Sequence, residues 1–190
     1  MTHTVAAFDF DGTLTRRDTL LPFLVSVAGS ARVSSALLAA LPKFGAGRNA
    51  AKAVLLERVL AGRDQDELAA AGIAFGERLA RRSITHGMRE RLTWHQREGH
   101  EIVIVSATLD LYLRPAAHEL DIEHVIATSL EPTTGRMSTA NCRGAEKARR
   151  LRDFLDDDTV VWAYGNSAGD REMLALAHHP VRVRRGRIIT

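Results

Sequence analysis

Three short apolar runs, separated by long stretches of helical character, constrain the fold of this 190-residue chain most strongly. They are residues 4–10 (TVAAFDF), 101–108 (EIVIVSAT) and 159–164 (TVVWAY), and they are typical of strands buried on both faces of a sheet. Because helical patterns lie between them, we predict an α/β fold with a doubly wound, mostly parallel sheet. Weaker patterns predict the remaining elements: strands at 123–127 and near Val181, helices at 109–120, 145–155 and 167–177, and a Gly-turned hairpin at 131–137.

The stretch between the first and second predicted strands has a different character. From Asp18 to about Ala80 the sequence shows no strand-like alternation. Its Ala-, Leu-, Arg- and Glu-rich segments are interrupted at Gly29, at residues 42–47 and at Gly62. This pattern predicts a helical insert that short connections join to the rest of the chain.

Composition and charge exclude several classes of protein. The 26 basic and 23 acidic residues give a net charge of only +3, so we expect no nucleic-acid partner. The lone Cys142 and the lack of a secretory leader predict a cytoplasmic protein. The apolar stretch 19–42 contains Pro22, Gly29 and Arg32, which break the continuous run that a transmembrane helix needs. A helical hairpin is the favoured interpretation, and peripheral membrane contact is the alternative.

Polar residues follow each of the three main strands. Asp9 and Asp11 end the first, Ser106 ends the second, and Asn166 follows the third. Ligands of doubly wound sheets bind beyond the carboxyl ends of the strands, so we expect these side chains to gather there. In extended backbone Asp9 and Asp11 point to the same side, and such a pair favours a cation. Asp170 lies four residues after Asn166, and both carry the oxygen ligands that Mg²⁺ prefers.

The chemistry of these groups suggests phosphoryl transfer. A carboxylate held near Mg²⁺ stays ionised and can attack phosphorus, whereas a neighbouring carboxyl can give a proton to the leaving oxygen. We therefore predict Asp9 as the nucleophile and Asp11 as the acid and base. Gly12 allows the chain to turn sharply after the two acids. Hydrogen-bond donors for the phosphate oxygens are Thr13, Ser106 and the backbone amide of Ala107, and Lys147 can neutralise charge on the nucleophile and the phosphate.

Each of these residues has an ordinary structural interpretation when taken alone. Capping and turn formation account for the acids, Ser106 and Asn166, and a solvated helix position accounts for Lys147. Their order and their common place at strand ends favour a site. The Arg-rich segment 182–187 alternates along the last predicted strand, which indicates a solvated edge, with binding of an anionic partner as the alternative.

The segments FDFDGTLT, VSAT and YGNSAGDREML, with Lys147 between the last two, resemble the signature motifs of the haloacid dehalogenase superfamily of aspartate phosphatases. The resemblance is greatest to the phosphoserine-phosphatase-like branch, in which a helical cap follows the first motif. It implies a Rossmann-like core of residues 1–15 and 83–190 and an inserted all-helical cap of residues 16–82.

The resemblance also implies roles for individual residues. Asp9 is the nucleophile and a metal ligand, Asp11 is the acid and base with its backbone carbonyl on the metal, and Ser106 and Lys147 contact the phosphate. Asn166, where the family usually has an acid, and Asp170 complete the Mg²⁺ site. Substrate recognition is assigned by two looser matches: Asp18 and Arg58 stand for the Glu and Arg that hold the amino acid in phosphoserine phosphatases.

These observations predict an Mg²⁺-dependent phosphomonoester hydrolase that forms a phospho-aspartyl intermediate at Asp9. The expected substrate is a small phosphorylated metabolite, such as phosphoserine. Two alternatives stay open. The same chemistry can serve a membrane lipid phosphate, approached through the apolar stretch 19–42. A catalytically silent binding module can also use this fold, because a fold does not establish an activity.

Overall fold

A six-stranded sheet forms the centre of the protein, in the order β3-β2-β1-β4-β5-β6. The structure, a computed structural model, describes residues 3–131 and 133–189. Strands β1 to β5 run parallel and β6 pairs antiparallel with β5, which confirms the predicted doubly wound, mostly parallel α/β fold. The strands are β1 (Thr4–Phe8), β2 (Glu101–Leu109), β3 (His124–Thr128), β4 (Val160–Gly165), β5 (His179–Arg184) and β6 (Arg187–Ile188).

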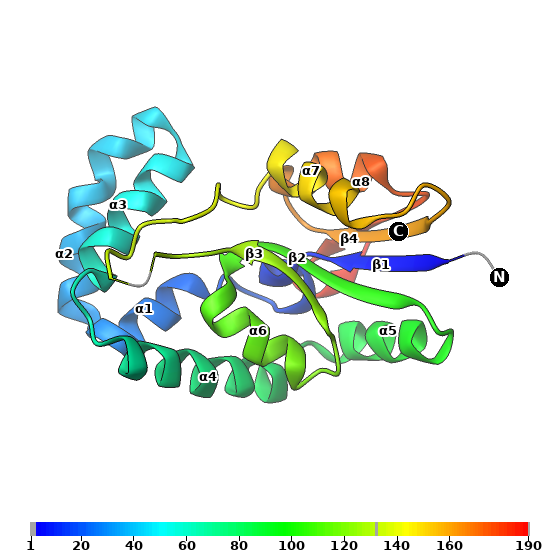
Figure 1. The fold of residues 1–190 in the computed structure, drawn as a ribbon, viewed down its shortest axis with the longest axis horizontal. Coiled ribbons are helices and arrows are strands. Elements are labelled where there is room, and N and C mark those ends of the chain that lie inside the picture. The colour runs from blue at the N-terminus through cyan, green and yellow to red at the C-terminus, as the bar shows by residue number, and fades with distance from the viewer. Residues whose placement is uncertain (1–2, 132, 190) are drawn as a thin grey trace.

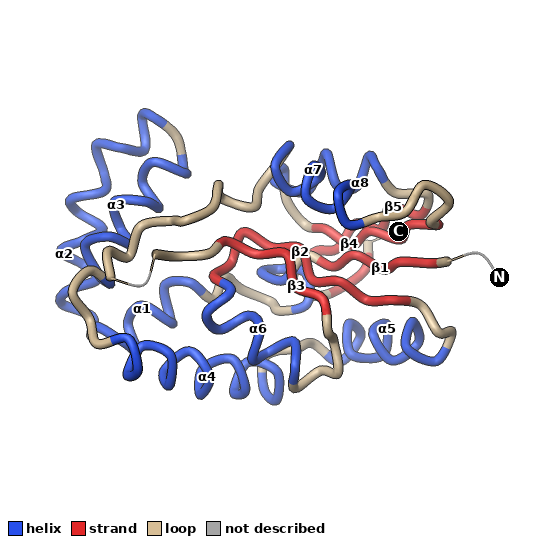
Figure 2. Tube along the Cα trace, viewed as in Figure 1, coloured by secondary structure: helices blue, strands red, loops and turns tan. Residues whose placement is uncertain are grey.

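Helices cover both faces of the sheet. Helices α7 and α8 lie over one face and α5 and α6 over the other, while α1 to α3 extend beyond the carboxyl ends of the strands (Figure 1; Figure 2). The helices are α1 (Leu20–Ala28), α2 (Ser30–Ala40), α3 (Arg48–Leu60), α4 (Gln65–Arg82), α5 (His86–Arg97), α6 (Asp110–His118), α7 (Ala145–Phe154) and α8 (Arg171–Leu176), with short helical turns at Phe10–Leu14, Leu41–Ala46 and Ala168–Asp170.

The two-residue period of the strands divides the core into two layers. Alternate side chains of β1 and β2 pack toward α7 and α8, where Val5, Val103 and Leu151 belong to one buried cluster. The intervening side chains, such as Phe8 and Ile104, join the larger cluster on the side of α5, α6 and the insert. Both faces of the central strands are therefore buried, which explains why their sequences are continuously apolar.

Three predicted boundaries differ from the structure. The first strand ends at Phe8, because residues 10–14 fold into a tight helical turn. The second strand continues past Ser106 to Leu109. The Gly-turned hairpin predicted at 131–137 begins one residue earlier and is reduced to a single antiparallel bridge between Leu130 and Met137, with Gly135 in the turn at a φ of 68°; Pro132 lies outside the described residues.

The insert is helical, as predicted, and its last helix packs on a core helix. A Cβ at Gly72 of α4 would lie 2.6 Å from the Leu111 carbonyl oxygen, and one at Gly76 would overlap the Tyr112 carbonyl oxygen, so the two glycines let α4 approach α6 closely. A bridge between Thr15 and Ile84 closes the base of the insert. The division into a core and a cap of residues 16–82 stays a prediction.

The apolar stretch 19–42 forms the short helices α1 and α2, joined at Gly29, but not the expected hairpin: α2 turns steeply away from α1 and packs along α3 instead (Figure 1). Within residues 3–131 and 133–189, no helix has the length and apolar character needed to cross a membrane. Three large apolar side chains near the tip are more than half exposed: Leu38 at 68%, Leu41 at 57% and Phe44 at 51%. The tip of the insert thus presents apolar surface to solvent.

Candidate active site

The first catalytic element is the loop that leaves β1. Strand β1 lies between β2 and β4, so the sheet changes its winding direction there, and the carboxyl ends of these strands form a crevice. Asp9 and Asp11 have extended backbone, and Gly12 reverses the chain with a φ of 79°. A Cβ at Gly12 would collide with the Asn166 side chain, which explains the need for glycine.

A pocket of about 300 Å³, here called the catalytic pocket, opens above these strand ends. It combines residues from the ends of β1, β2 and β4 with residues from the insert and from the loop before α7. Its lining consists of Asp9, Asp11, Gly12, Arg16, Arg17, Asp18, Arg48, Ser106, Ala107, Arg143, Lys147, Asn166, Ser167, Gly169 and Asp170.

The Lys147 ammonium bridges two buried carboxylates. Its Nζ lies 2.7 Å from Asp9 Oδ1 and 2.5 Å from Asp170 Oδ1, and all three side chains are buried. Burial alone would lower the pKa of Lys147, but the two carboxylates raise it, so the ammonium stays charged. Burial raises the pKa of Asp9, as does the nearby Asp170 carboxylate, although Lys147 acts in the opposite direction.

Asp170 is the more strongly stabilised of the two carboxylates. Burial acts to raise its pKa, but Lys147 and Ser167 lower it on balance. Its Oδ2 accepts hydrogen bonds from the backbone amide of Asn166 (3.2 Å) and from the backbone amide and hydroxyl of Ser167 (2.9 and 2.8 Å). Four donors therefore hold Asp170 in its ionised form and fix the turn after β4.

Asp11 has a different environment from Asp9. Its Oδ1 accepts hydrogen bonds from the Thr19 amide (3.1 Å) and hydroxyl (2.8 Å), and its Oδ2 accepts one from the Thr108 hydroxyl (2.8 Å). Burial, followed by repulsion from Asp18, raises the pKa of Asp11 to about 7. A carboxyl with this pKa exists in both protonation states near neutral pH, as a general acid and base must.

The oxygen donors around the pocket suit a hard divalent cation. Asp9, Asp11, Asn166 and Asp170 line it together. Two buried carboxylates face one ammonium, which leaves excess negative charge for a cation to offset. Among the described residues no group of three or more His, Cys, Asp or Glu side chains is placed to hold a metal ion, and the Asp11 carboxylate faces Thr19 and Thr108. A cation here would therefore use amide or backbone oxygens as well.

The remaining candidates from the motifs lie close to Asp9. Ser106 and Ala107 line the pocket at the end of β2, and Ser106 Oγ accepts a hydrogen bond from the Thr108 amide at 3.2 Å. The Thr13 hydroxyl donates to Asp9 Oδ2 at 3.0 Å and is fully buried. Thr13, expected at the substrate, is absent from the pocket lining and instead orients the Asp9 carboxylate.

The two candidates for substrate recognition have different positions. Asp18 lines the catalytic pocket, and its Oδ1 accepts a hydrogen bond from the Leu20 amide at 3.0 Å. Arg58 is exposed on α3 and lies outside the pocket lining, so the structure does not bring it to the site. The buried side chains around Arg58 on α3 are Leu56, Val59 and Leu60, and position 58 lies on the opposite side of the helix from them.

Several pocket residues were not predicted from the sequence. Arg16, Arg17, Arg48 and Arg143 all line the catalytic pocket. The Arg143 guanidinium lies where a side chain at Gly169 would be, so the glycine makes room for it. Arg16 and Arg17 directly follow the first motif and could have been considered from their position, whereas only the packing of the insert and of the loop before α7 brings Arg48 and Arg143 to the pocket.

Lys52 of α3 also reaches the carboxyl edge of the sheet. Its Nζ donates to the Ala107 carbonyl oxygen at 2.5 Å and to Asn141 Oδ1 at 2.7 Å, while Asn141 Nδ2 donates to Asn49 Oδ1 at 2.7 Å. Burial lowers the pKa of Lys52 to about 8. These bonds attach the insert to the end of β2 and to the loop before α7.

A doubly wound sheet with a helical insert and an aspartate-lysine-aspartate cluster at its switch point defines an α/β enzyme site. A family model described as haloacid dehalogenase-like hydrolase matches residues 6–175. The chain belongs to this family, as the motif resemblance predicted. Protein CicA from Caulobacter vibrioides is 33% identical over 185 residues, which cover 91% of this chain and 82% of the relative.

Solved structures share the fold over almost the whole chain. A protein of unknown function from Bordetella pertussis Tohama I matches with a TM-score of 0.80 and 23% identity, covering 96% of this chain and 89% of that one. A substrate-bound phosphoserine phosphatase matches with a TM-score of 0.66 and 18% identity, covering 96% and 85%. The fold is therefore that of the phosphoserine-phosphatase-like branch, with the insert after the first strand.

Proposed function

We propose that this protein is an Mg²⁺-dependent phosphatase that removes phosphate from a small organic monoester through a phospho-aspartyl intermediate at Asp9. The observation that carries the proposal is the contrast between two carboxyl groups in one pocket. Asp9 contacts the Lys147 ammonium at 2.7 Å, whereas the pKa of Asp11 is raised to about 7. Two acids whose environments differ in this way can divide the nucleophile and acid roles between them.

In the first half-reaction an Asp9 carboxylate oxygen attacks phosphorus, and the bond from phosphorus to the leaving oxygen breaks. Protonated Asp11 gives its proton to that oxygen, so the product leaves as an alcohol. Lys147 and the hydroxyl of Ser106 stabilise the charge on the transferring group. Thr13 holds the Asp9 carboxylate in place through its 3.0 Å hydrogen bond.

In the second half-reaction water attacks the phosphorus of the phospho-aspartate. Asp11, now ionised, accepts the proton of this water, and the bond between phosphorus and the Asp9 oxygen breaks. Inorganic phosphate leaves, Asp9 is regenerated and Asp11 is protonated again. One carboxyl therefore serves both halves of the cycle.

Asp9, Asn166, Asp170 and the Asp11 backbone carbonyl are the groups that would hold Mg²⁺. The cation would neutralise charge on the phosphate and keep the Asp9 carboxylate ionised despite its burial. Asn166 contributes no charge of its own, so the site has one negative charge fewer than one with an acid at this position.

The test is release of phosphate from a panel of monoesters, including phosphoserine, sugar phosphates and amino-alcohol phosphates, with Mg²⁺ and with EDTA. We expect Asp9→Asn to abolish turnover, because an amide is a poor nucleophile. The control is Asp153→Asn, the same change at an exposed position of α7, which should retain full activity. Equal turnover by parent and Asp9→Asn would refute the proposal.

Trapping of the intermediate separates the phosphatase from a silent binding module. Phosphate bound to Asp9 after rapid acid quench, identified by mass spectrometry of the peptide, would support catalysis. A protein that binds the panel but yields neither phospho-Asp9 nor phosphate would be a binding module.

One observation favours a second candidate, a phosphatase of a membrane lipid phosphate. Leu38, Leu41 and Phe44 expose apolar surface at the tip of the insert, beside the exposed Lys43. An apolar patch with a neighbouring basic residue suits contact with an anionic membrane surface. We expect the parent to float with anionic vesicles and the variant with Leu41→Ser and Phe44→Ser to lose this association; lack of flotation of the parent would refute the candidate.

A further inference from the structure

A cavity lined only by arginines lies beside the catalytic pocket. This arginine cavity has a volume of about 520 Å³ and is formed by Arg16, Arg17, Arg184, Arg185 and Arg187. All five are exposed, and none forms an ion pair with a carboxylate of residues 3–131 and 133–189. Five guanidinium groups repel one another unless an anion lies between them. Their planar fork suits phosphate oxygens.

The arginine cavity adjoins the catalytic pocket through two shared lining residues. Arg16 and Arg17 line both, so a ligand on Asp9 and a ligand in the arginine cavity share two guanidinium groups. The other three arginines belong to the β5–β6 hairpin, whose Gly186 amide donates to the Gly12 carbonyl oxygen at 3.2 Å. The hairpin is therefore attached directly to the loop that carries the catalytic acids.

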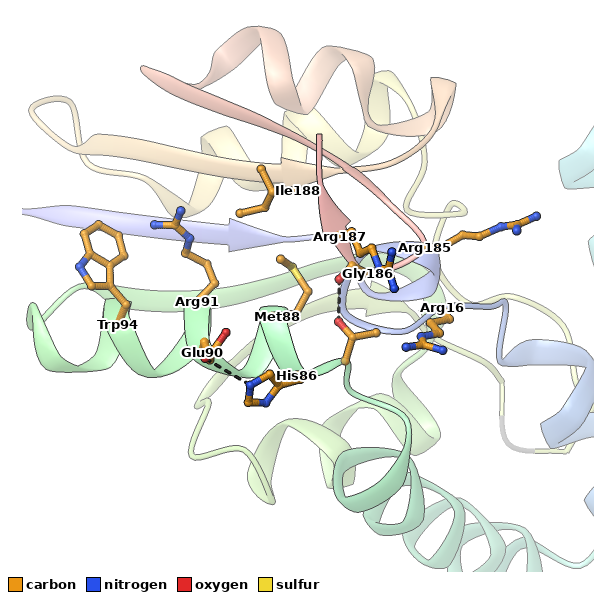
Figure 3. A pocket seen from close by; sticks show the side chains of 12 residues that line it. Arg16, His86, Met88, Glu90, Arg91, Trp94, Arg185, Gly186, Arg187 and Ile188 are labelled. Atoms are coloured by element: carbon orange, nitrogen blue, oxygen red, sulfur yellow. Dashed lines mark hydrogen bonds and ion pairs between the residues drawn. The ribbon is translucent and has the colours of Figure 1, made fainter. Parts of the chain in front are cut away.

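A second contact holds the hairpin from the other side. The Thr85 hydroxyl donates to the Gly186 carbonyl oxygen at 2.8 Å (Figure 3). Arg16, Arg185 and Arg187 lie at one end of a further pocket of about 670 Å³ along α5, whose lining includes Met88 and Trp94 (Figure 3). The arginines thus occupy a defined position between the catalytic loop and a partly apolar hollow.

We propose that the substrate carries a second phosphate group and that the arginine cavity binds it while the scissile phosphate lies at Asp9. This inference rests on the proposed phosphatase function and adds a substrate class to it. A phosphate in this cavity would accept hydrogen bonds from the guanidinium groups and offset their mutual repulsion. The same chemistry occurs in a small soluble bisphosphate and in the phosphodiester of a lipid headgroup.

The first experiment measures binding without turnover. Fructose 1,6-bisphosphate and fructose 6-phosphate are titrated calorimetrically into the full chain in EDTA. The variant is Arg184→Gln with Arg185→Gln and Arg187→Gln. The control variant loses the same three charges at exposed arginines outside both pockets: Arg32→Gln, Arg114→Gln and Arg152→Gln. We expect the hairpin variant alone to lose about tenfold or more of its affinity for the bisphosphate.

The second experiment measures turnover with Mg²⁺. We expect the hairpin variant to raise KM for the bisphosphate about tenfold while kcat, and KM for the monophosphate, stay close to those of the parent. Flotation with phosphatidylglycerol vesicles tests whether the second phosphate belongs to a lipid or to a soluble compound. If the parent and the control variant bind the vesicles and the hairpin variant does not, the second phosphate is assigned to a lipid. Unchanged binding of both bisphosphate and vesicles by the hairpin variant would overturn the inference. Absence of turnover with retained, arginine-dependent binding would refute the phosphatase function alone.

Discussion

Replacement of Lys147 by Met should destabilise the protein strongly. The ammonium lies 2.7 Å from Asp9 and 2.5 Å from Asp170, and the exposed fractions of the three side chains are 2%, 8% and 2%. Without it, two carboxylates of like charge remain buried with no cation between them. Removal of one partner from a buried ion pair costs about 3–5 kcal/mol. For a chain of this length that corresponds to a fall in Tm of about 6–20 °C.

Urea denaturation of the parent and of Lys147→Met in EDTA gives the change in the free energy of unfolding. Arg149→Met on the same helix is the matched control, because Arg149 is 56% exposed and its ion pairs with Glu146 and Asp153 lie at the surface. We expect the control to cost less than about 1 kcal/mol. The loss in Lys147→Met should be smaller near pH 5 than near pH 8, since a buried Asp9 without its cation takes up a proton at acid pH.

A double-mutant cycle tests the electrostatic cause. Asp9→Asn removes one of the two repelling charges, so Asp9→Asn combined with Lys147→Met should cost less than the sum of the two single changes, by more than about 1 kcal/mol. If Lys147→Met is no more destabilising than Arg149→Met, or if the two changes are additive, the reasoning about this buried cluster is wrong.

Three further predictions concern stability and contacts. Burial lowers the pKa of His95 to about 3, below its unfolded value near 6.5, so the stability that neutral His95 provides above pH 6.5 is lost as the pH falls. In urea denaturation the free energy of unfolding of the parent should therefore fall by about 1–2 kcal/mol more between pH 7 and pH 5 than that of His95→Gln. Gly76→Ala should lower the Tm because the new Cβ overlaps α6, whereas Gly87→Ala, in an exposed turn of α5 with free space, should leave the Tm unchanged or raise it; equal effects would refute this account. Lys52→Met should accelerate hydrogen exchange of the α3 amides through loss of its bonds to Ala107 and Asn141, and unchanged exchange would contradict that role.

The sheet and the family could be predicted from the sequence because each signal is local. The apolar runs of β1, β2 and β4 are buried on both faces, and their composition alone distinguishes them from the amphipathic helices. Asp9, Ser106 and Asn166 immediately follow or end such runs, so parallel pairing places them at one edge. Lys147 lies far from them in sequence, and only its place in the motif order indicated its role.

The substrate side of the site could not be predicted in the same way. Arg58 was chosen by a loose match, and it is exposed outside the pocket because the buried Leu56, Val59 and Leu60 lie on the opposite side of α3. Arg48 and Lys52, one turn apart on the same helix, reach the carboxyl edge instead. The rotation of a helix about its axis depends on what it packs against, which short motifs do not record.

The sequence predicted the exposure of the arginines in the C-terminal hairpin but not their position beside the catalytic loop. Their alternation predicted an exposed strand edge, and all of Arg184, Arg185 and Arg187 are indeed exposed. Their position beside Arg16 and Arg17 depends on the pairing of β5 with β4 and on hydrogen bonds of Gly186 to Gly12 and Thr85, which are far from it in the chain.

The sequence by itself determined the layered fold, the family and the order of the catalytic groups, since strand composition and the residues at strand ends are local properties. The tertiary structure decided which side chains of the insert line the catalytic pocket and which arginines of the C-terminal hairpin form the cavity beside it. Those contacts join residues that are far apart in the sequence, and they exist only once helix packing and the β5–β6 turn have fixed their distance from Asp9.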